Sequence, residues 1–243
     1  MKKVLASIGI GNATVDTVLP KNTVRPGETV DADVHITGGN VEQDVGTIRF
    51  ELETRYRTDE GYQTGDIDRF TLAESLTIHP EQEEVRSTEI EIPYSTPVTV
   101  GGVDVWIETE LDIDFAVDPE DRDYLDVRPT PRLQTVFDVL GDLGFSLQTA
   151  ECEADPYGHY TDRRFIQEFE FRTTGRFRDS LDEIEIVAHP GPHELELFLE
   201  VDRRGGLLSE VTDLDERHDR MTVRSTDAET IHNDIVALIE KHV

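Results

Sequence analysis

Residues 118–145 read DPEDRDYLDVRPTPRLQTVFDVLGDLGF, and this stretch decides how the rest of the chain is organised. Within it, Arg128-Pro129-Thr130-Pro131 favours extended backbone, because each proline fixes its own φ and disfavours the α-helical region for the residue before it. Immediately afterwards, apolar residues recur at helical spacing and a glycine offers a helix stop: Leu133, Val136, Phe137, Leu140, Leu143 and Gly144. The stretch therefore predicts a stiff joint and then a helix at about 131–143, between two runs of β-strands.

The segments on both sides of this joint alternate apolar and polar residues with period two. Such alternation is typical of antiparallel strands with one buried and one solvated face, and Gly, Pro and Asn residues separate the segments. A second amphipathic helix is predicted at about 227–242. We therefore expect an all-β fold with two peripheral helices, built as two antiparallel β-sandwich lobes at 1–127 and 128–243. The alternating segments are 13–19, 30–36, 48–56, 67–78, 85–92, 103–115, 145–152, 165–173, 181–188, 195–201 and 221–224.

The charge balance is strongly acidic: 53 Asp and Glu residues face 23 Lys and Arg residues, for a net charge of −30. This charge disfavours binding to nucleic acid and to anionic membranes. No apolar run is long enough to span a membrane. The single Cys152 cannot form an internal disulfide, which fits a reducing compartment and favours a cytoplasmic location.

The acidic residues occupy the polar positions of the strand patterns, so they predict self-repulsion across a folded surface. Dissolved salt relieves such repulsion, because the Debye length falls to roughly 3 Å at 1 M. We therefore expect the melting temperature of the protein to rise between low and molar KCl, as in a halophilic protein. A melting curve that does not move with KCl would contradict this hypothesis.

Several stretches in order along the chain resemble one protein family. They are Lys3–Gly11 (KVLASIGIG), Ile36–Gln43 (ITGGNVEQ), the joint from Asp118-Pro119 to Arg128-Pro129, Phe165–Phe171 (FIQEFEF) and Glu200–Arg204 (EVDRR). The chain is identified by them as similar to the sporulation-control (SpoOM-type) family of bacteria and archaea, prokaryotic relatives of arrestins. The acidic composition favours a member from a halophilic archaeon. The resemblance implies an arrestin-like fold of two β-sandwich lobes and a regulatory role without catalysis.

The residues themselves offer little support for an enzyme, a metal site or a bound cofactor. Cys152 stands between Glu151 and Glu153, which disfavour a reactive thiolate. His189 and His193 flank a proline-rich turn, yet no spaced set of further ligands joins them. Acidic pairs recur at i, i+2 on solvated strand faces, as expected in so acidic a chain. We therefore predict a non-enzymatic protein without a cofactor or metal.

Clustered arginines are the candidate partner-binding residues. A guanidinium group binds carboxylates and phosphates through two parallel hydrogen bonds, and the resemblance implies that basic positions engage phosphorylated or acidic partners. In the alternative interpretation, these arginines pair with carboxylates of the same chain, for example Glu168, Glu170 or Asp179. The candidates are Arg163, Arg164, Arg176, Arg178, Arg203 and Arg204.

Trp106 is the only tryptophan, and it falls on the polar register of its predicted strand. Either another part of the chain covers it, or it marks an interface with a partner or a second copy in a homodimer. Taken together, the sequence favours an arrestin-like adaptor or regulator that binds proteins. The alternatives are a small-ligand or carbohydrate-binding β-sandwich, with or without calcium, and a hydrolase that uses scattered carboxylates.

Overall fold

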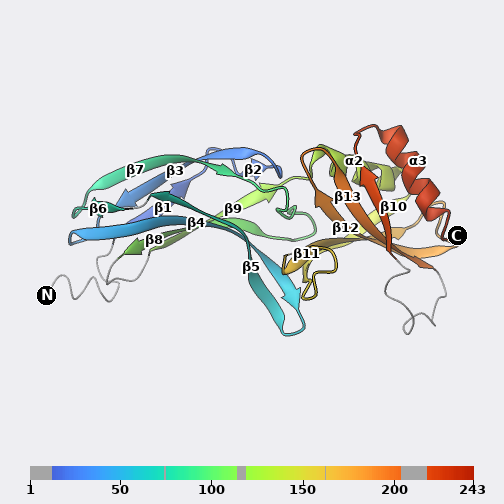
Figure 1. Cartoon of the computed structure of the whole chain (residues 1–243), viewed down its shortest axis with the longest axis horizontal. Coiled ribbons are helices and arrows are strands. Elements are labelled where there is room, and N and C mark those ends of the chain that lie inside the picture. Colours follow the sequence, from blue (N-terminus) through green and yellow to red (C-terminus); the bar gives the residue numbers. More distant parts are fainter. Residues whose placement is uncertain (1–12, 74, 114–118, 162, 204–217) are drawn as a thin grey trace.

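A computed structural model describes residues 13–73, 75–113, 119–161, 163–203 and 218–243. The molecule is elongated, with the strands of the N-terminal half at one end and both helices at the other (Figure 1). Within these residues the chain is mostly β-strand with two helices, so the prediction of a β fold with two peripheral helices is confirmed. The stretch 3–11, which carries part of the family resemblance, lies outside the described residues.

Two facing sheets make up the N-terminal half. The smaller sheet has the strand order β1-β3-β7, and the larger one contains β4-β8-β9-β2, with β5 and β6 both paired to β4. Alternate side chains of these strands point between the sheets; in β3, for example, every second residue is buried. The strands are β1 (Thr14–Val18), β2 (Thr23–Val24), β3 (Thr29–Thr37), β4 (Gln43–Thr58), β5 (Gly61–Ala73), β6 (Leu76–Ile78), β7 (Glu83–Glu91), β8 (Val105–Ile113) and β9 (Glu120–Val127).

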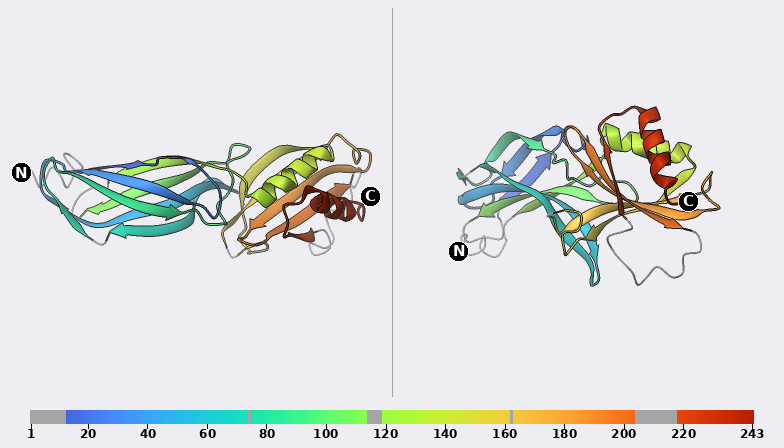
Figure 2. Two further views of the ribbon diagram at one scale, coloured as in Figure 1. Left: turned by 90° about the horizontal axis from the view of Figure 1, so that it is seen from above. Right: turned by 45° about the vertical axis from the view of Figure 1, so that its right-hand side comes forward.

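The C-terminal half is a curled sheet in the order β14-β13-β12-β11-β10, with both helices on one of its faces (Figure 2). Phe137 of α2 packs edge-on against Phe169 at a ring distance of 5.0 Å, so the helix closes the core over β11. The elements are α2 (Pro131–Asp142), β10 (Phe145–Ala154), β11 (Phe165–Thr173), β12 (Leu181–Pro190), β13 (Leu195–Arg203), β14 (His218–Val223) and α3 (Ala228–Ile239).

Local sequence signals set the ends of both helices. In α2, Pro131 occupies the first turn and the Thr130 side chain accepts a hydrogen bond from the Leu133 backbone N–H. Gly144 follows the helix with φ +85°, a conformation that glycine adopts at no steric cost. In α3, the Asp227 side chain accepts from the Thr230 backbone N–H. Both predicted helices are therefore confirmed, each within about three residues of its expected ends.

The joint is shorter than the sequence predicted. Glu120–Val127 was assigned to the passage between the two runs of strands, but it forms β9 and pairs along β8. Its buried Leu125 and Val127 face the core, and Arg122 on the other face pairs with Glu108 of β8. Asp121 and Asp123, on the same side of the strand as Leu125 and Val127, break the apolar alternation and hide this strand. The division into lobes at 127/128 stays a prediction.

Strand β4 also belongs to both halves, because its far end pairs in parallel with β10 between Arg57 and Glu153. This bridge joins the sheets of the two halves into one continuous sheet. The β4–β5 hairpin therefore projects from the N-terminal half and lies beside β11 of the C-terminal half (Figure 1). None of the described helices is both long and apolar enough to cross a membrane.

Candidate functional site

The two halves meet where the end of the β4–β5 hairpin packs against β11. Tyr56 stacks on Phe165 with a ring-centroid distance of 5.2 Å. Gly65 of β5 lies against both rings, and a Cβ added there would stand 2.7 Å from a Phe165 ring carbon. Only glycine leaves room for this close packing, so the hairpin reaches the C-terminal half without a gap.

Polar contacts also cross this junction. The Gln167 side chain accepts from the Val98 backbone N–H at 2.8 Å and donates to the Val98 carbonyl at 2.7 Å. Arg57 forms ion pairs with Glu153 and, at 3.2 Å, with Glu151. Because backbone, side chain and apolar contacts all cross the junction, the two halves are held in a defined arrangement.

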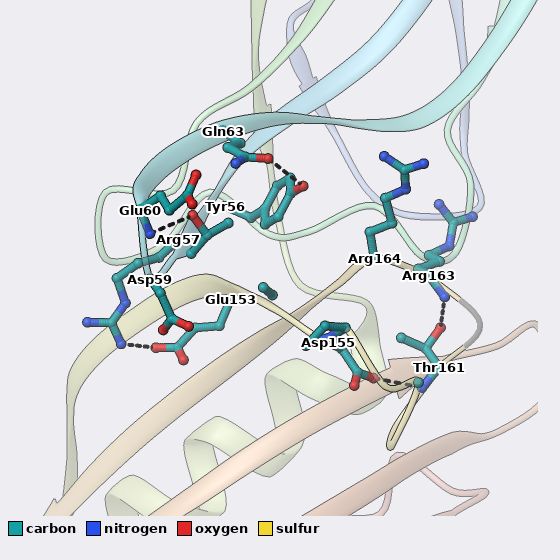
Figure 3. A pocket seen from close by; sticks show the side chains of 14 residues that line it. Tyr56, Arg57, Asp59, Glu60, Gln63, Glu153, Asp155, Thr161, Arg163 and Arg164 are labelled. Carbon is teal, nitrogen blue, oxygen red and sulfur yellow. Dashed lines mark hydrogen bonds and ion pairs between the residues drawn. The ribbon is translucent and has the colours of Figure 1, made fainter.

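An open groove of about 1080 Å³ lies at this junction, between the tip of the β4–β5 hairpin and the loop from β10 to β11 (Figure 3). The buried Asp155 side chain organises the loop by accepting from the backbone N–H groups of His159, Tyr160 and Thr161 at 2.9, 3.0 and 3.3 Å. Such multiple acceptance fixes loop backbone that would otherwise be free. We call this space the junction groove.

Side chains of both charges line the junction groove. Arg163 and Arg164 lie on the loop side, and Asp59 and Glu60 lie at the hairpin tip (Figure 3). One Nη of Arg163 donates to the Ile67 carbonyl at 2.7 Å, which holds this half-buried side chain in place. Arg164 is exposed. Among the described residues, neither guanidinium forms an ion pair with a carboxylate.

Two of the other candidate arginines form ion pairs within the chain, and the remaining two lie wholly or partly outside the residues that the structure describes. Arg176 binds Glu240 of α3 at 2.6 Å, and Arg178 lies 3.6 Å from Asp179. These two support the alternative of internal pairing. Arg204 lies outside the described residues, as does the side chain of Arg203. The structure thus brings only Arg163 and Arg164 into one groove.

Trp106 is covered by its own chain. It is 2% exposed, and its Nε1–H donates to Glu53 at 2.8 Å. The Arg122 guanidinium lies 4.8 Å from the ring centroid, and Tyr124 packs against the indole from the neighbouring strand. Because so little of the indole is exposed, it offers a partner little surface, which supports the interpretation that its own chain covers it.

Three carboxylates next to this tryptophan are close enough to be considered as a cation site. Ligand oxygens of Glu51, Glu53 and Asp66 lie within 4.8 Å of one another. Arg69 already pairs with Glu51 at 3.2 Å and with Asp66 at 2.9 Å, so a guanidinium neutralises much of this charge. Burial raises the pKa of Glu53 to about 7, and its protonated form needs no cation.

The residues considered for catalysis do not converge. Cys152 is buried, and burial raises the pKa of its thiol to about 12, which opposes nucleophilic chemistry. His189 is half-buried against Phe198 with a ring distance of 5.3 Å, and burial lowers its pKa. Among the described residues, no set of nucleophile, base and third group lies together.

Sequence reasoning found the two groove arginines but missed the wall that faces them. The hairpin tip lies about a hundred residues earlier in the chain, and no local pattern connects the two segments. Gly65 stands between two alternating segments, where it indicates a turn. The structure instead places it inside β5, and a glycine inside a strand marks a place where another part of the molecule comes close.

Comparisons with known proteins show the family to which the chain belongs. Residues 1–205 match the model of the SpoOM protein family. The chain is 41% identical over 210 residues to the sporulation-control protein spo0M of Bacillus subtilis, covering 84% of this chain and 80% of that protein. The crystal structure of Spo0M from Bacillus subtilis superposes with a TM-score of 0.87 at 33% identity, covering 96% of this chain and all of that one. A family match over most of the sequence and the same fold together establish that this chain belongs to the SpoOM family.

Proposed function

We propose that this chain is an arrestin-like regulatory protein that acts by binding other proteins, with Arg163 and Arg164 as its main contact. The name of its Bacillus relative, a sporulation-control protein, supports a regulatory role. The main support for this site is that the two arginines have no carboxylate partner within the described residues. In a chain with 53 acidic residues, both line an open groove, and neither has a carboxylate partner among the residues that the structure describes.

The geometry fits recognition better than structural support. Arg163 uses one hydrogen-bonding group on the Ile67 carbonyl, which leaves most of its five N–H donors available. The side chain is thus oriented before a partner arrives, so less conformational entropy is lost on binding. Arg164 beside it adds a second guanidinium. Together they form a local cationic surface that attracts an acidic segment of a partner.

The test is recovery of partners by the tagged full-length protein from its own cells, in molar KCl. Replacing Arg163 and Arg164 with Gln is expected to reduce recovery of a reproducible partner at least tenfold, because each lost charge-assisted hydrogen bond costs about 1.5–3 kcal/mol. The matched control replaces Arg176 and Arg178 with Gln, which removes the same charge outside the groove. Equal recovery by both folded variants would refute the proposed site.

A further inference from the structure

A second, smaller cavity opens beside the junction groove. This crevice has a volume of about 140 Å³, and its lining includes Tyr94, Pro97, Leu133, Phe165, Phe169 and Pro190. It is formed by the segment before β8, the start of α2 and strands β11 and β12, so both halves of the molecule contribute. A cavity of roughly 150 Å³ with such apolar walls accommodates a benzene-sized group. The apolar crevice is therefore the right size for one large apolar side chain.

Arg163 connects the two cavities, because it lines both the junction groove and the apolar crevice. A ligand that contacts this guanidinium with a carboxylate consequently has the crevice within reach of its neighbouring side chains. The walls are held in advance: Gln167, which also lines the crevice, is bonded at both ends of its amide to Val98. Such preorganisation reduces the cost of binding.

Thr96 gives an independent indication that the crevice receives a ligand. It lines the crevice and is only 3% exposed, yet its hydroxyl has no hydrogen-bond partner among the described residues. A buried, unpaired polar group costs about 1–3 kcal/mol. Because Thr96 lines the crevice, an amide or carbonyl of a peptide that enters it is a candidate partner for this hydroxyl.

We propose that the arginine pair and the apolar crevice together bind an extended peptide segment of a partner protein. In this segment an Asp or Glu lies two positions from a Leu, Ile, Met or Phe. The carboxylate meets Arg163 and Arg164, and the apolar side chain fills the crevice. Residues i and i+2 of an extended chain point to the same side about 7 Å apart, which fits two adjoining sites that share one arginine.

The charges around the groove favour a carboxylate over a phosphate. Asp59, Glu60 and Glu153 line the same groove, and the whole chain carries a net charge of −30. A phosphate group carries nearly twice the charge of a carboxylate and is repelled correspondingly more. The acidic hairpin tip also favours a basic residue further along the bound segment.

This inference rests on the proposed function, and its test uses variants that separate the two. The full chain is used to select binders from a library of random displayed octapeptides. Wild-type protein is expected to enrich peptides with the acidic–apolar pairing. Changing Arg163 and Arg164 to Gln should abolish selection for the acidic residue. Ala188→Leu, which enlarges a half-buried crevice residue, should abolish selection for the apolar residue and retain the acidic one.

The control for the crevice is Ala188→Ser, which leaves its volume nearly unchanged and should select the wild-type motif. The melting temperature of each variant shows that it is folded. The absence of the paired motif in the wild-type selection, or its persistence in Ala188→Leu, would overturn the inference. Tenfold tighter binding when phosphoserine replaces the acidic residue in a selected peptide would overturn the choice of a carboxylate. A cellular partner lost with the arginine variant but retained with Ala188→Leu would keep the proposed function and remove the crevice from it.

Discussion

Replacing Gly38 with alanine is expected to lower the free energy of unfolding by about 2–4 kcal/mol, since overpacking a fitted site costs about 1–3 kcal/mol and a backbone obstacle adds to it. A Cβ at this position would lie 1.9 Å from the His79 carbonyl oxygen. The obstacle is backbone, and it is held from both sides: the Gly38 N–H donates to the Gln82 carbonyl at 2.8 Å, and the Gly38 carbonyl accepts from Glu81 at 3.2 Å. Relief therefore requires β3 and the turn at 79–82 to move apart.

Gly141→Ala is the matched control, because nothing lies within 4 Å of a Cβ added to Gly141 near the end of α2. Alanine is the better helix former by about 1 kcal/mol, so this variant is expected to be as stable as the wild type or more stable. Thermal and urea unfolding in molar KCl measure both. Equal stability of the Gly38 variant and the wild type would show that the turn adapts, contrary to the tight packing described here.

Lowering the pH from 8 to 5 is expected to stabilise the protein, and Glu53 is one of the residues that contribute to this effect. Burial raises its pKa from 4.5 to about 7, although the Trp106 N–H bond lowers it. A group whose pKa is raised by folding binds protons more tightly in the folded state, so its stabilising contribution is present below pH 4.5 and is lost as the pH rises through 7. Burial likewise raises the pKa of Glu168 and of Glu185 to about 7.

Glu53→Gln isolates this effect, because the amide is neutral at every pH and its oxygen still accepts from Trp106. At pH 8 the variant is expected to be more stable than the wild type by about 1–3 kcal/mol, a range reduced from the full linkage value because the group retains some solvent access. At pH 5 the difference should be small. Melting temperatures in molar KCl, where general repulsion is screened, measure it; Glu60→Gln at the exposed hairpin tip should show no such pH-dependent gain. A constant difference between the two pH values would refute the raised pKa.

The helices and strands could be predicted from the sequence wherever one face of the element is buried and the other is solvated. The alternation through β3 and the apolar stripe of α2 report a strand and a helix without reference to the rest of the chain. Strand β9 was missed because Asp121 and Asp123 occupy positions on the same side as its buried residues, so its apolar signal is confined to Leu125 and Val127. What makes it a strand is the neighbouring β8, which lies outside any local window.

Only part of the candidate site could be predicted from the sequence, because its two sides lie far apart along the chain. Residue type singled out Arg163 and Arg164 together with Arg176 and Arg178, since all four carry the same chemistry. Their difference lies in what surrounds them: Glu240 reaches Arg176 from the C-terminal helix, while the groove arginines face a hairpin from the other half of the molecule. Pairing across such sequence distances depends on the tertiary fold.

The β4–β5 hairpin is synthesised well before the strand against which it packs. Its aromatic Tyr56 finds its partner Phe165 only 109 residues later. At ribosomal speeds of roughly 5–20 residues per second, the hairpin end waits about 5–20 s before that partner is synthesised. During this interval Tyr56 and the face of Gly65 remain uncovered on the nascent chain. Asp59 and Glu60 at the tip are charged residues beside this uncovered surface, a placement that disfavours aggregation of an exposed strand.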